Sequence, residues 1–311
     1  MIDKIKDFAK TIGIEMIGFS NYYVDNELKE RHLYKKRQGY DIPFNYDPNI
    51  VNDPRHLLES VSIIITIALP YYKTCEQLEN IKENEVYFSS SSWGKDYHTV
   101  LNKKFDQIVN FLKSYYPCLE YIKCVDTKPI DDRFWAIQSG IGFIGKNGLV
   151  VNEKYGSYIF IGNLLTNLDI KIPSQKKSLL ENKCDSCNKC MLSCPTKAIK
   201  DDGINSRECL SYLTQKKGTL STTEIKQINN CIYGCDICLR VCPYNAKVKD
   251  GYHEFKATGI EFININTFKE MSNKEFKKNY GQLAGSWCGK KVVERNIKIY
   301  REKIDNKSSM C

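Results

Sequence analysis

The spacing of hydrophobic residues predicts the first elements of the chain. Apolar residues recur at helical intervals over residues 2–12, so a helix is expected there, ending at Gly13. Residues 14–19 are predicted to form a short strand. The polar, aromatic and proline-containing segment 34–54 predicts a long loop. The β-branched run 61–69 predicts a strand that is buried on both faces.

Helices and strands continue to alternate up to residue ~170, which predicts an α/β or α+β domain over residues 1–170. The further elements expected in this region are a helix from Asp96 to Pro117, a strand over 121–125, a short helix from Asp131 or Asp132 to Gly140, and a pair of strands over 148–151 and 157–165.

Two runs of cysteine dominate the second half of the chain. The first has the pattern C-x2-C-x2-C-x3-C-P, and both runs end in Cys-Pro with the spacing of bacterial ferredoxin motifs. Thiolates at this spacing suit iron–sulfur clusters. The members are Cys184, Cys187, Cys190 and Cys194 in the first run, and Cys235, Cys238 and Cys242 in the second.

Two 4Fe-4S clusters are therefore expected. The last cysteine of such a run ligates the other cluster. This rule predicts one set of ligands that combines Cys184, Cys187 and Cys190 with Cys242, and a second set that combines Cys194 with Cys235 and Cys238.

The second cluster is one ligand short in this scheme. Ile232 stands where a fully repeated motif would have cysteine, and Cys209 and Cys231 are the available substitutes. Spacing alone does not decide between them. Structural zinc is the alternative for the whole stretch, because zinc also binds paired C-x2-C motifs. The third cysteine of each run and the two Cys-Pro endings favour clusters.

The cysteine runs also define the remaining domains. The polar, basic segment 171–183 predicts a linker, and residues 171–250 are predicted to form a ferredoxin-like domain that holds both clusters. A tail over residues 251–311 follows. It contains a basic helix over 290–304, for which a solvated surface face is the simplest interpretation.

Composition and charge indicate which partners and which cellular compartment to expect. The hydrophobic content of 42% over 311 residues supports a folded core, and the net charge of +9 is a weak indication of a polyanionic partner. A lysine-rich surface without such a partner would give the same charge. Fourteen cysteines in a secreted protein would suggest disulfides, but seven or eight of these cysteines have cluster spacing. The first residues are predicted to form an amphipathic helix rather than a signal peptide, so a reducing cytoplasm is expected. The longest apolar run, 61–70, is too short for a membrane span, so no membrane is expected as a partner.

An ordered series of short motifs then resembles one family. It comprises Val125-Asp126-Thr127, Asp132-Arg133, Gly140-Ile141-Gly142-Phe143, Cys209-Leu210-Ser211-Tyr212-Leu213-Thr214 and Tyr233-Gly234-Cys235-Asp236-Ile237-Cys238. This series is similar to that of the epoxyqueuosine reductases, and the resemblance runs from about Asp53 to Asn296.

The resemblance implies a cofactor, a reaction and partners. Family members bind cobalamin in the N-terminal domain and reduce the epoxide of epoxyqueuosine to the alkene of queuosine. The substrate is the wobble nucleoside of tRNAs with a GUN anticodon, which are those for Asp, Asn, His and Tyr. An external electron donor and a monomeric protein are expected. The resemblance also implies that Cys209 completes the second cluster and that Cys231 is not a ligand.

Particular site residues follow from the same resemblance. The family's proton donor is an acidic residue just before an arginine, which corresponds to Asp132. Asp132 could equally be a helix N-cap, although Asp131 is the simplest cap and Asp126 is the competing acid. Arg55 matches a position near the corrinoid. Ser211, Gln215 and Asp236 are expected to line the same face of the cofactor.

The chain departs from many family members because it ends at Cys311 without a helical repeat region, so tRNA contacts from such repeats are expected to be absent. Two rival functions remain on sequence grounds. A corrinoid reductive dehalogenase pairs the same cofactors but usually carries an export signal. A ferredoxin-like electron carrier or assembly scaffold would bind no corrinoid.

Overall fold

The computed structural model describes residues 1–43, 46–173, 177, 183–248, 251–266, 268 and 271–308. The chain divides into two compact units that interleave in the sequence. The first unit comprises residues 1–70 and 98–188, and the second comprises residues 71–97 and 189–311. Of the predicted linker 171–183, residues 174–176 and 178–182 lie outside the described residues, as do residues 249–250 at the predicted boundary of the cluster domain.

A four-stranded antiparallel sheet forms the centre of the first unit. Its order is β1-β2-β7-β4, and its strands are β1 (Met16–Asn21), β2 (Ile63–Pro70), β7 (Ile159–Thr166) and β4 (Tyr121–Cys124). The strands predicted over 14–19, 61–69 and 121–125 are thereby confirmed, with small shifts at their ends. Because every neighbouring pair is antiparallel, the unit is of the α+β kind within the predicted mixed class.

The predicted pairing of strand 148–151 with strand 157–165 is wrong. Instead β6 (Val150–Val151) pairs with β5 (Phe143–Ile144), and β7 lies between β2 and β4. An isolated bridge between Asn152 and Gly156 joins the two segments. The eight-residue β7 is almost wholly buried, so it gains more from a central place in the large sheet than from a short hairpin.

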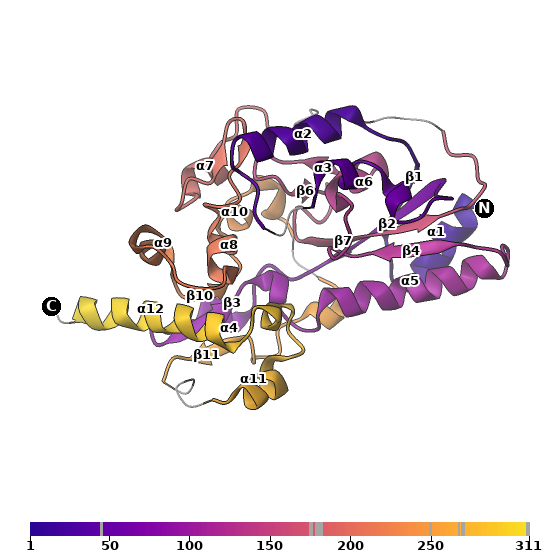
Figure 1. Ribbon diagram of the computed structural model, residues 1–311. Helices are drawn as coiled ribbons and strands as arrows, with labels where there is room; N and C mark the ends of the chain where they lie inside the picture. Colours follow the sequence, from indigo (N-terminus) through magenta and orange to yellow (C-terminus); the bar gives the residue numbers. More distant parts are fainter. Residues whose placement is uncertain are drawn as a thin grey trace. The chain divides into compact units, whose positions relative to one another are not determined.

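Helices cover both faces of this sheet (Figure 1). On one side, α1 (Ile2–Thr11) packs against α5 (Tyr97–Lys113), where Phe8 and Phe111 stack with ring centroids 4.4 Å apart. On the other side lies α6 (Asp132–Gln138), which contacts β1, β2 and β7. The helices predicted at 2–12, after Asp96 and at Asp132 are thus confirmed.

The predicted loop over residues 34–54 is wrong in part. Helix α2 (Asn26–Arg37) extends into it, and a short helix α3 (Pro48–Val51) and a 3-10 turn (Pro54–His56) follow. The Asp25 carboxylate caps α2 by accepting a hydrogen bond from the Leu28 N–H at 2.8 Å. Residues 44–45 of the predicted loop lie outside the described residues.

The second unit contains a three-stranded sheet of order β10-β3-β11. Strand β10 (Cys231–Tyr233) is parallel to β3 (Glu85–Phe88), and β11 (Phe262–Asn264) is antiparallel to it. A small hairpin joins β8 (Ile199–Lys200) to β9 (Gly203–Ile204). The helices of this unit are α4 (Glu76–Glu79), α7 (Lys189–Ser193), α8 (Leu210–Gln215), α9 (Thr222–Gln227), α10 (Ile237–Arg240), α11 (Asn273–Tyr280) and α12 (Lys290–Ser308), with 3-10 turns at Ser90–Ser92, Pro243–Asn245, His253–Phe255 and Ala284–Cys288.

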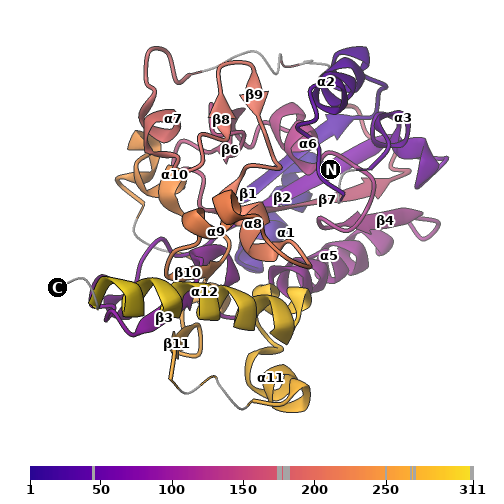
Figure 2. The ribbon, with the colours of Figure 1, turned by 60° about the vertical axis from the view of Figure 1, so that its left-hand side comes forward.

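The predicted tail helix over 290–304 is confirmed as α12, which runs alongside the three-stranded sheet (Figure 2). Val293 and Ile297 on α12 pack into the core of the unit. The buried Asn296 donates hydrogen bonds to the carbonyl oxygens of Thr214 and Ile232 at 2.7 and 2.8 Å. Part of the basic helix is therefore structural rather than a fully solvated face.

None of the helices in the described part of the chain is both long and apolar enough to cross a membrane.

Candidate active site

Two consecutive carboxyl groups at the start of α6 have different surroundings. Asp131 is the helix N-cap, and its carboxylate accepts hydrogen bonds from the backbone N–H groups of Arg133 and Phe134 at 3.1 and 3.0 Å. Nε2 of His32 on α2 lies 3.1 Å from its other oxygen. Burial alone would raise the pKa of Asp131, but the His32 hydrogen bond and the Arg133 charge hold it well below its usual range. Asp131 is thus an ionised, structural carboxylate.

The neighbouring Asp132 is not used as a cap. Its Oδ1 accepts a hydrogen bond from Nδ2 of Asn163 at 2.6 Å, and its Oδ2 accepts one from the backbone N–H of Asp126 at 3.1 Å. Burial raises the pKa of Asp132 to about 8 despite these bonds, and the charge of Asp126 adds to the rise. A carboxyl group in this state is protonated at neutral pH and can donate its proton.

Sequence reasoning missed the residues that hold Asp132. Asn163 on β7 and Thr66 on β2 are opposite each other in the sheet and are both 0% exposed. Oγ1 of Thr66 donates a hydrogen bond to Oδ1 of Asn163 at 2.6 Å. Each is a polar residue within an otherwise apolar stretch of strand, and this break in the pattern is the signal that could have found them.

Arg55 lies in the first unit and shares the Asp53 carboxylate with Tyr22, which directly follows β1. Its guanidinium donates hydrogen bonds to the Asp53 carboxylate at 2.6–3.0 Å, and Tyr22 donates its hydroxyl proton to the same carboxylate at 2.9 Å. The hydrogen bond from Arg55 lowers the pKa of Asp53 to about 2. The Arg55 side chain nevertheless remains 52% exposed, so it is accessible to a ligand.

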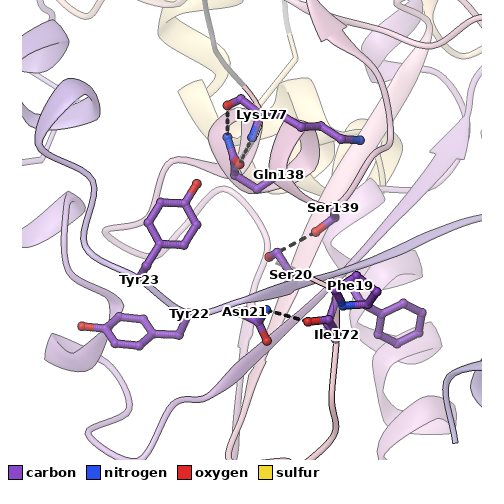
Figure 3. Close-up of a pocket in the computed structure, with 10 residues that line it drawn as sticks. Phe19, Ser20, Asn21, Tyr22, Tyr23, Gln138, Ser139, Ile172 and Lys177 are labelled. Atoms are coloured by element: carbon purple, nitrogen blue, oxygen red, sulfur yellow. Dashed lines mark hydrogen bonds between the residues drawn. The ribbon is translucent and has the colours of Figure 1, made fainter. Parts of the chain in front are cut away.

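A cavity of about 480 Å³ opens next to the end of β1 (Figure 3). Tyr22 and Tyr23 form one side of it, and hydroxyl groups of Ser20 and Ser139 lie 3.4 Å apart on another. The full lining comprises Phe19, Ser20, Asn21, Tyr22, Tyr23, Gln138, Ser139, Ile172, Pro173 and Lys177. This mixture of aromatic, hydroxyl and amide groups suits a ligand with both ring and polar parts.

The other predicted cofactor contacts belong to the second unit. Ser211 and Gln215 lie one turn apart on α8, and Nε2 of Gln215 donates a hydrogen bond to Oγ of Ser211 at 3.2 Å. Asp236 is 3% exposed, and its carboxylate accepts a hydrogen bond from the Ser90 N–H at 2.8 Å. Burial raises the pKa of Asp236. The structure thus brings Ser211 and Gln215 together and engages Asp236 with the backbone.

Cysteines from both runs and Cys209 lie near one another in the second unit. Helices α7 and α10, which carry Cys190 and Cys238, pack against each other. Cys190, Cys209 and Cys238 contact the small hydrophobic cluster that contains Cys194. Burial raises the pKa of the Cys238 thiol, and the charges of Cys235, Cys209, Cys190 and Cys194 raise it further. Cysteines of the two runs thus lie near one another, as ligand sets that combine both runs require. Over the described residues, no three Cys, His, Asp or Glu side chains converge as they would around a single metal ion.

Cys231 has different surroundings. It is 2% exposed and packs with Tyr87, Trp93 and Phe262 around the three-stranded sheet. Its thiol donates to the carbonyl oxygen of Tyr233 at 3.4 Å. Burial raises the pKa of the Cys231 thiol well above its usual range, with further contributions from Asp236 and Cys235.

Two family models match the chain. Residues 183–245 match a 4Fe-4S double cluster binding domain, and residues 52–127 match a model described as epoxyqueuosine reductase QueG, DUF1730. The first match agrees with the cluster prediction made from cysteine spacing, so the chain contains an iron–sulfur double-cluster domain.

Curated proteins match over nearly the whole chain. The epoxyqueuosine reductase of Lactococcus garvieae is 35% identical over 302 residues, which is 95% of this chain and 84% of that protein. The epoxyqueuosine reductase of Bacillus subtilis is 36% identical over 302 residues, covering 94% of this chain and 77% of that protein.

Solved structures agree with these relatives. A crystal structure of epoxyqueuosine reductase with an epoxyqueuosine-modified tRNA-Tyr stem loop superposes with a TM-score of 0.89 and 34% identity, covering 96% of this chain and 80% of that one. A Bacillus subtilis epoxyqueuosine reductase, with its aspartate-bearing catalytic loop swung out of the active site, gives a TM-score of 0.87 and 33% identity over the same shares. This chain belongs to the epoxyqueuosine reductase family.

Proposed function

We propose that this protein reduces epoxyqueuosine to queuosine at the wobble position of tRNAs with a GUN anticodon, in the cytoplasm and as a monomer. Family membership over 95% of the chain supports the reaction, and the solved relative with a tRNA-Tyr stem loop supports the substrate. The observation in this structure that carries the proposal is Asp132, a carboxyl group that is free of helix capping and has a pKa raised to about 8.

The reaction has a simple balance. Conversion of the epoxide to an alkene consumes two electrons and two protons and releases the oxygen as water. Opening the ring leaves negative charge on that oxygen, so an acid placed beside it lowers the barrier. Asp132 supplies this proton, and a second proton from solvent completes the departing water. Asn163 and the Asp126 N–H stabilise the carboxylate that is left on Asp132. Iron–sulfur clusters held by the cysteine sets given below would supply the route by which electrons from an external donor reach the site.

Cobalamin is the cofactor that the resemblance implies, and the residues present fit it. The hydroxyl and amide groups of Ser20, Asn21 and Ser139 in the cavity can hydrogen-bond the amide side chains at the edge of a corrin. Arg55 offers an accessible cation, and Ser211, Gln215 and Asp236 are the further contacts proposed in the second unit. When bound, cobalamin would supply the strongly reducing metal centre that the epoxide requires.

The cluster ligands are proposed as the motifs predict. One set combines Cys184, Cys187 and Cys190 with Cys242, and the other combines Cys194, Cys209, Cys235 and Cys238. Cys209 and Cys238 pack against the hydrophobic cluster that contains Cys194, which supports the second set, and Cys190 of the first set packs there as well. The separate packing of Cys231 supports its exclusion.

The decisive experiment is anaerobic turnover of an epoxyqueuosine-modified anticodon stem loop by protein reconstituted with iron, sulfide and cobalamin. Queuosine formation detected by mass spectrometry, and its loss when cobalamin is omitted, is the expected result. A corrin absorption spectrum without turnover of this RNA would favour the dehalogenase alternative. Failure to bind any corrinoid would favour the electron carrier.

Turnover is expected to depend on pH with a single descending limb. The pKa of Asp132 lies above the usual carboxyl range, so the reactive protonated form persists up to about pH 8. Above that pH the rate should fall about tenfold per unit as the proton is lost. Cobalamin occupancy is measured at each pH as the control. A rate that falls instead with the ordinary carboxyl pKa of about 4 would contradict the assignment.

Binding of the stem loop is expected to weaken steeply with salt, because lysines and arginines displace counterions from phosphate. Lys291 on α12 is the better position for a charge reversal, since Lys290 is 14% exposed and pairs with Glu294 at 3.0 Å. Lys291→Glu should weaken binding of every tRNA alike and reduce the salt slope by roughly 0.7–0.9 per lost contact. Lys291→Arg, which keeps the charge, is the control. Salt-independent binding would remove RNA as the substrate.

A further inference from the structure

A row of residues at one register crosses the sheet of the first unit. Gly18 on β1 is opposite Thr66 on β2, Thr66 is opposite Asn163 on β7, and Asn163 is opposite Cys124 on β4. Paired residues of neighbouring strands point to the same face, which here is the face covered by α6. A Cβ at Gly18 would collide with the carbonyl oxygen of Ser139, so glycine allows the end of α6 to approach the row.

Hydrogen bonds along this row have a defined direction. The Asn163 amide presents Nδ2 to Oδ1 of Asp132 at 2.6 Å, which is the orientation that stabilises the carboxylate once Asp132 has given up its proton, because an ionised carboxylate only accepts. Oδ1 of Asn163 then faces Oγ1 of Thr66, also at 2.6 Å, and Thr66 must donate. The carbonyl oxygen of Trp135 is a more distant acceptor for Thr66 at 3.4 Å. Oγ of Ser139 lies 2.9 Å from Thr66 and extends the chain of hydroxyls towards Ser20 and the cavity.

We propose that Asn163 and Thr66 are positioning residues for the reaction, in which Thr66 fixes the orientation of the Asn163 amide so that its N–H donates to Asp132. The inference rests on the proposed role of Asp132. A flipped amide would set its oxygen against the carboxylate oxygen and would leave Thr66 facing an NH2 group. In that orientation Thr66 would accept from the NH2 group and would donate to the more distant carbonyl oxygen of Trp135 or to Ser139, so the observed orientation gives Thr66 its shortest donated hydrogen bond.

The consequence is control over how readily Asp132 gives up its proton. A hydrogen bond donated to the ionised form stabilises that form and lowers the pKa. Burial acts in the opposite direction and is the larger effect at Asp132. Without the Asn163 donor, burial would act with less opposition, and Asp132 would hold its proton more tightly and be a weaker acid.

The test measures the titration of Asp132 itself in the full-length, cluster-containing protein. The infrared band of its protonated carboxyl, assigned by its loss in Asp132→Asn, is followed against pH. Asn163→Leu should move the midpoint upward by roughly one to two units, because a hydrogen bond to a charged group contributes about 1.5–3 kcal/mol. Thr66→Val, which has nearly the same shape, should move it in the same direction by less. Thr66→Ser retains a hydroxyl and should titrate like the wild type.

The descending limb of the turnover–pH profile should move with the infrared midpoint in each variant. Iron content and circular dichroism show whether each variant is folded. If Thr66→Val does not fold, Asn163→Leu still tests the inference. An unchanged midpoint in Asn163→Leu, or in folded Thr66→Val, overturns the inference. A shifted midpoint with turnover that is indifferent to Asp132 supports the hydrogen-bond arrangement and instead overturns Asp132 as the proton donor.

Discussion

Asp132→Asn should lower turnover of epoxyqueuosine tRNA by a factor of about a hundred to ten thousand, the usual contribution of a positioned acid. The amide fits the space of the carboxyl but carries no transferable proton. The side-chain oxygen of the new asparagine can still accept the hydrogen bond that Nδ2 of Asn163 donates. Both clusters and cobalamin should therefore remain bound. The measurement is single-turnover product formation, normalised to the iron and corrin content of each preparation.

Asp126→Asn is the matched control. Asp126 is exposed and has a φ of 57°, a left-handed conformation that asparagine adopts as readily as aspartate. Its backbone N–H, which contacts Asp132, is retained in the variant. Turnover near the wild-type rate in Asp132→Asn with cofactors intact would remove this carboxyl as the proton donor. Loss of cobalamin in that variant would show a cofactor-holding role instead.

Cys209→Ala should cost the protein most of one cluster and nearly all activity. Two 4Fe-4S clusters correspond to about eight iron atoms per chain, and loss of one ligand should reduce the content towards about four. Cys209 contacts the hydrophobic cluster that contains Cys194. Burial raises the pKa of the Cys235 and Cys238 thiols, and the charge of Cys209 raises both further. Iron and sulfide analysis with electron paramagnetic resonance of the reduced protein would measure the loss.

Cys231→Ala is the informative comparison for the cluster. This thiol packs with Tyr87, Trp93 and Phe262 and has a carbonyl acceptor, so alanine there should lower stability slightly and leave the iron content unchanged. If Cys231→Ala lost iron while Cys209→Ala retained it, the ligand assignment would be reversed.

Much of the fold could be predicted because its signals are local. The β-branched run of β2 and the apolar stripe of α5 follow from residues close together in the chain. Helix α2 escaped prediction because it is strongly charged and Leu28 is its buried residue, so no apolar stripe marks it. The partner of β7 could not be predicted because strand pairing depends on residues far apart in sequence.

The candidate site divides in the same way. The cysteines of the two runs are recognisable as proposed ligands because a short loop sets the spacing within each run, whereas Cys209 lies in neither run and was proposed through the family resemblance. The different roles of Asp131 and Asp132 are not recognisable locally, because His32 and Asn163 come from distant parts of the chain to contact them. Asp132 could be proposed as the acid from sequence through the family resemblance. Its raised pKa could not be predicted, because burial in the folded chain causes it.

The position of β3 in the sequence has a consequence for folding during synthesis. This strand is the middle one of the second unit's sheet, yet it lies in the segment 71–97, long before β10 and β11. During synthesis β3 leaves the ribosome with neither of its neighbours, so its edges must wait unpaired until most of the chain has followed. A fragment that begins at residue 171 would contain every cluster cysteine but lack this strand. Such a fragment should fail to fold as an independent module, and supplying residues 71–97 as a separate peptide should partly restore it.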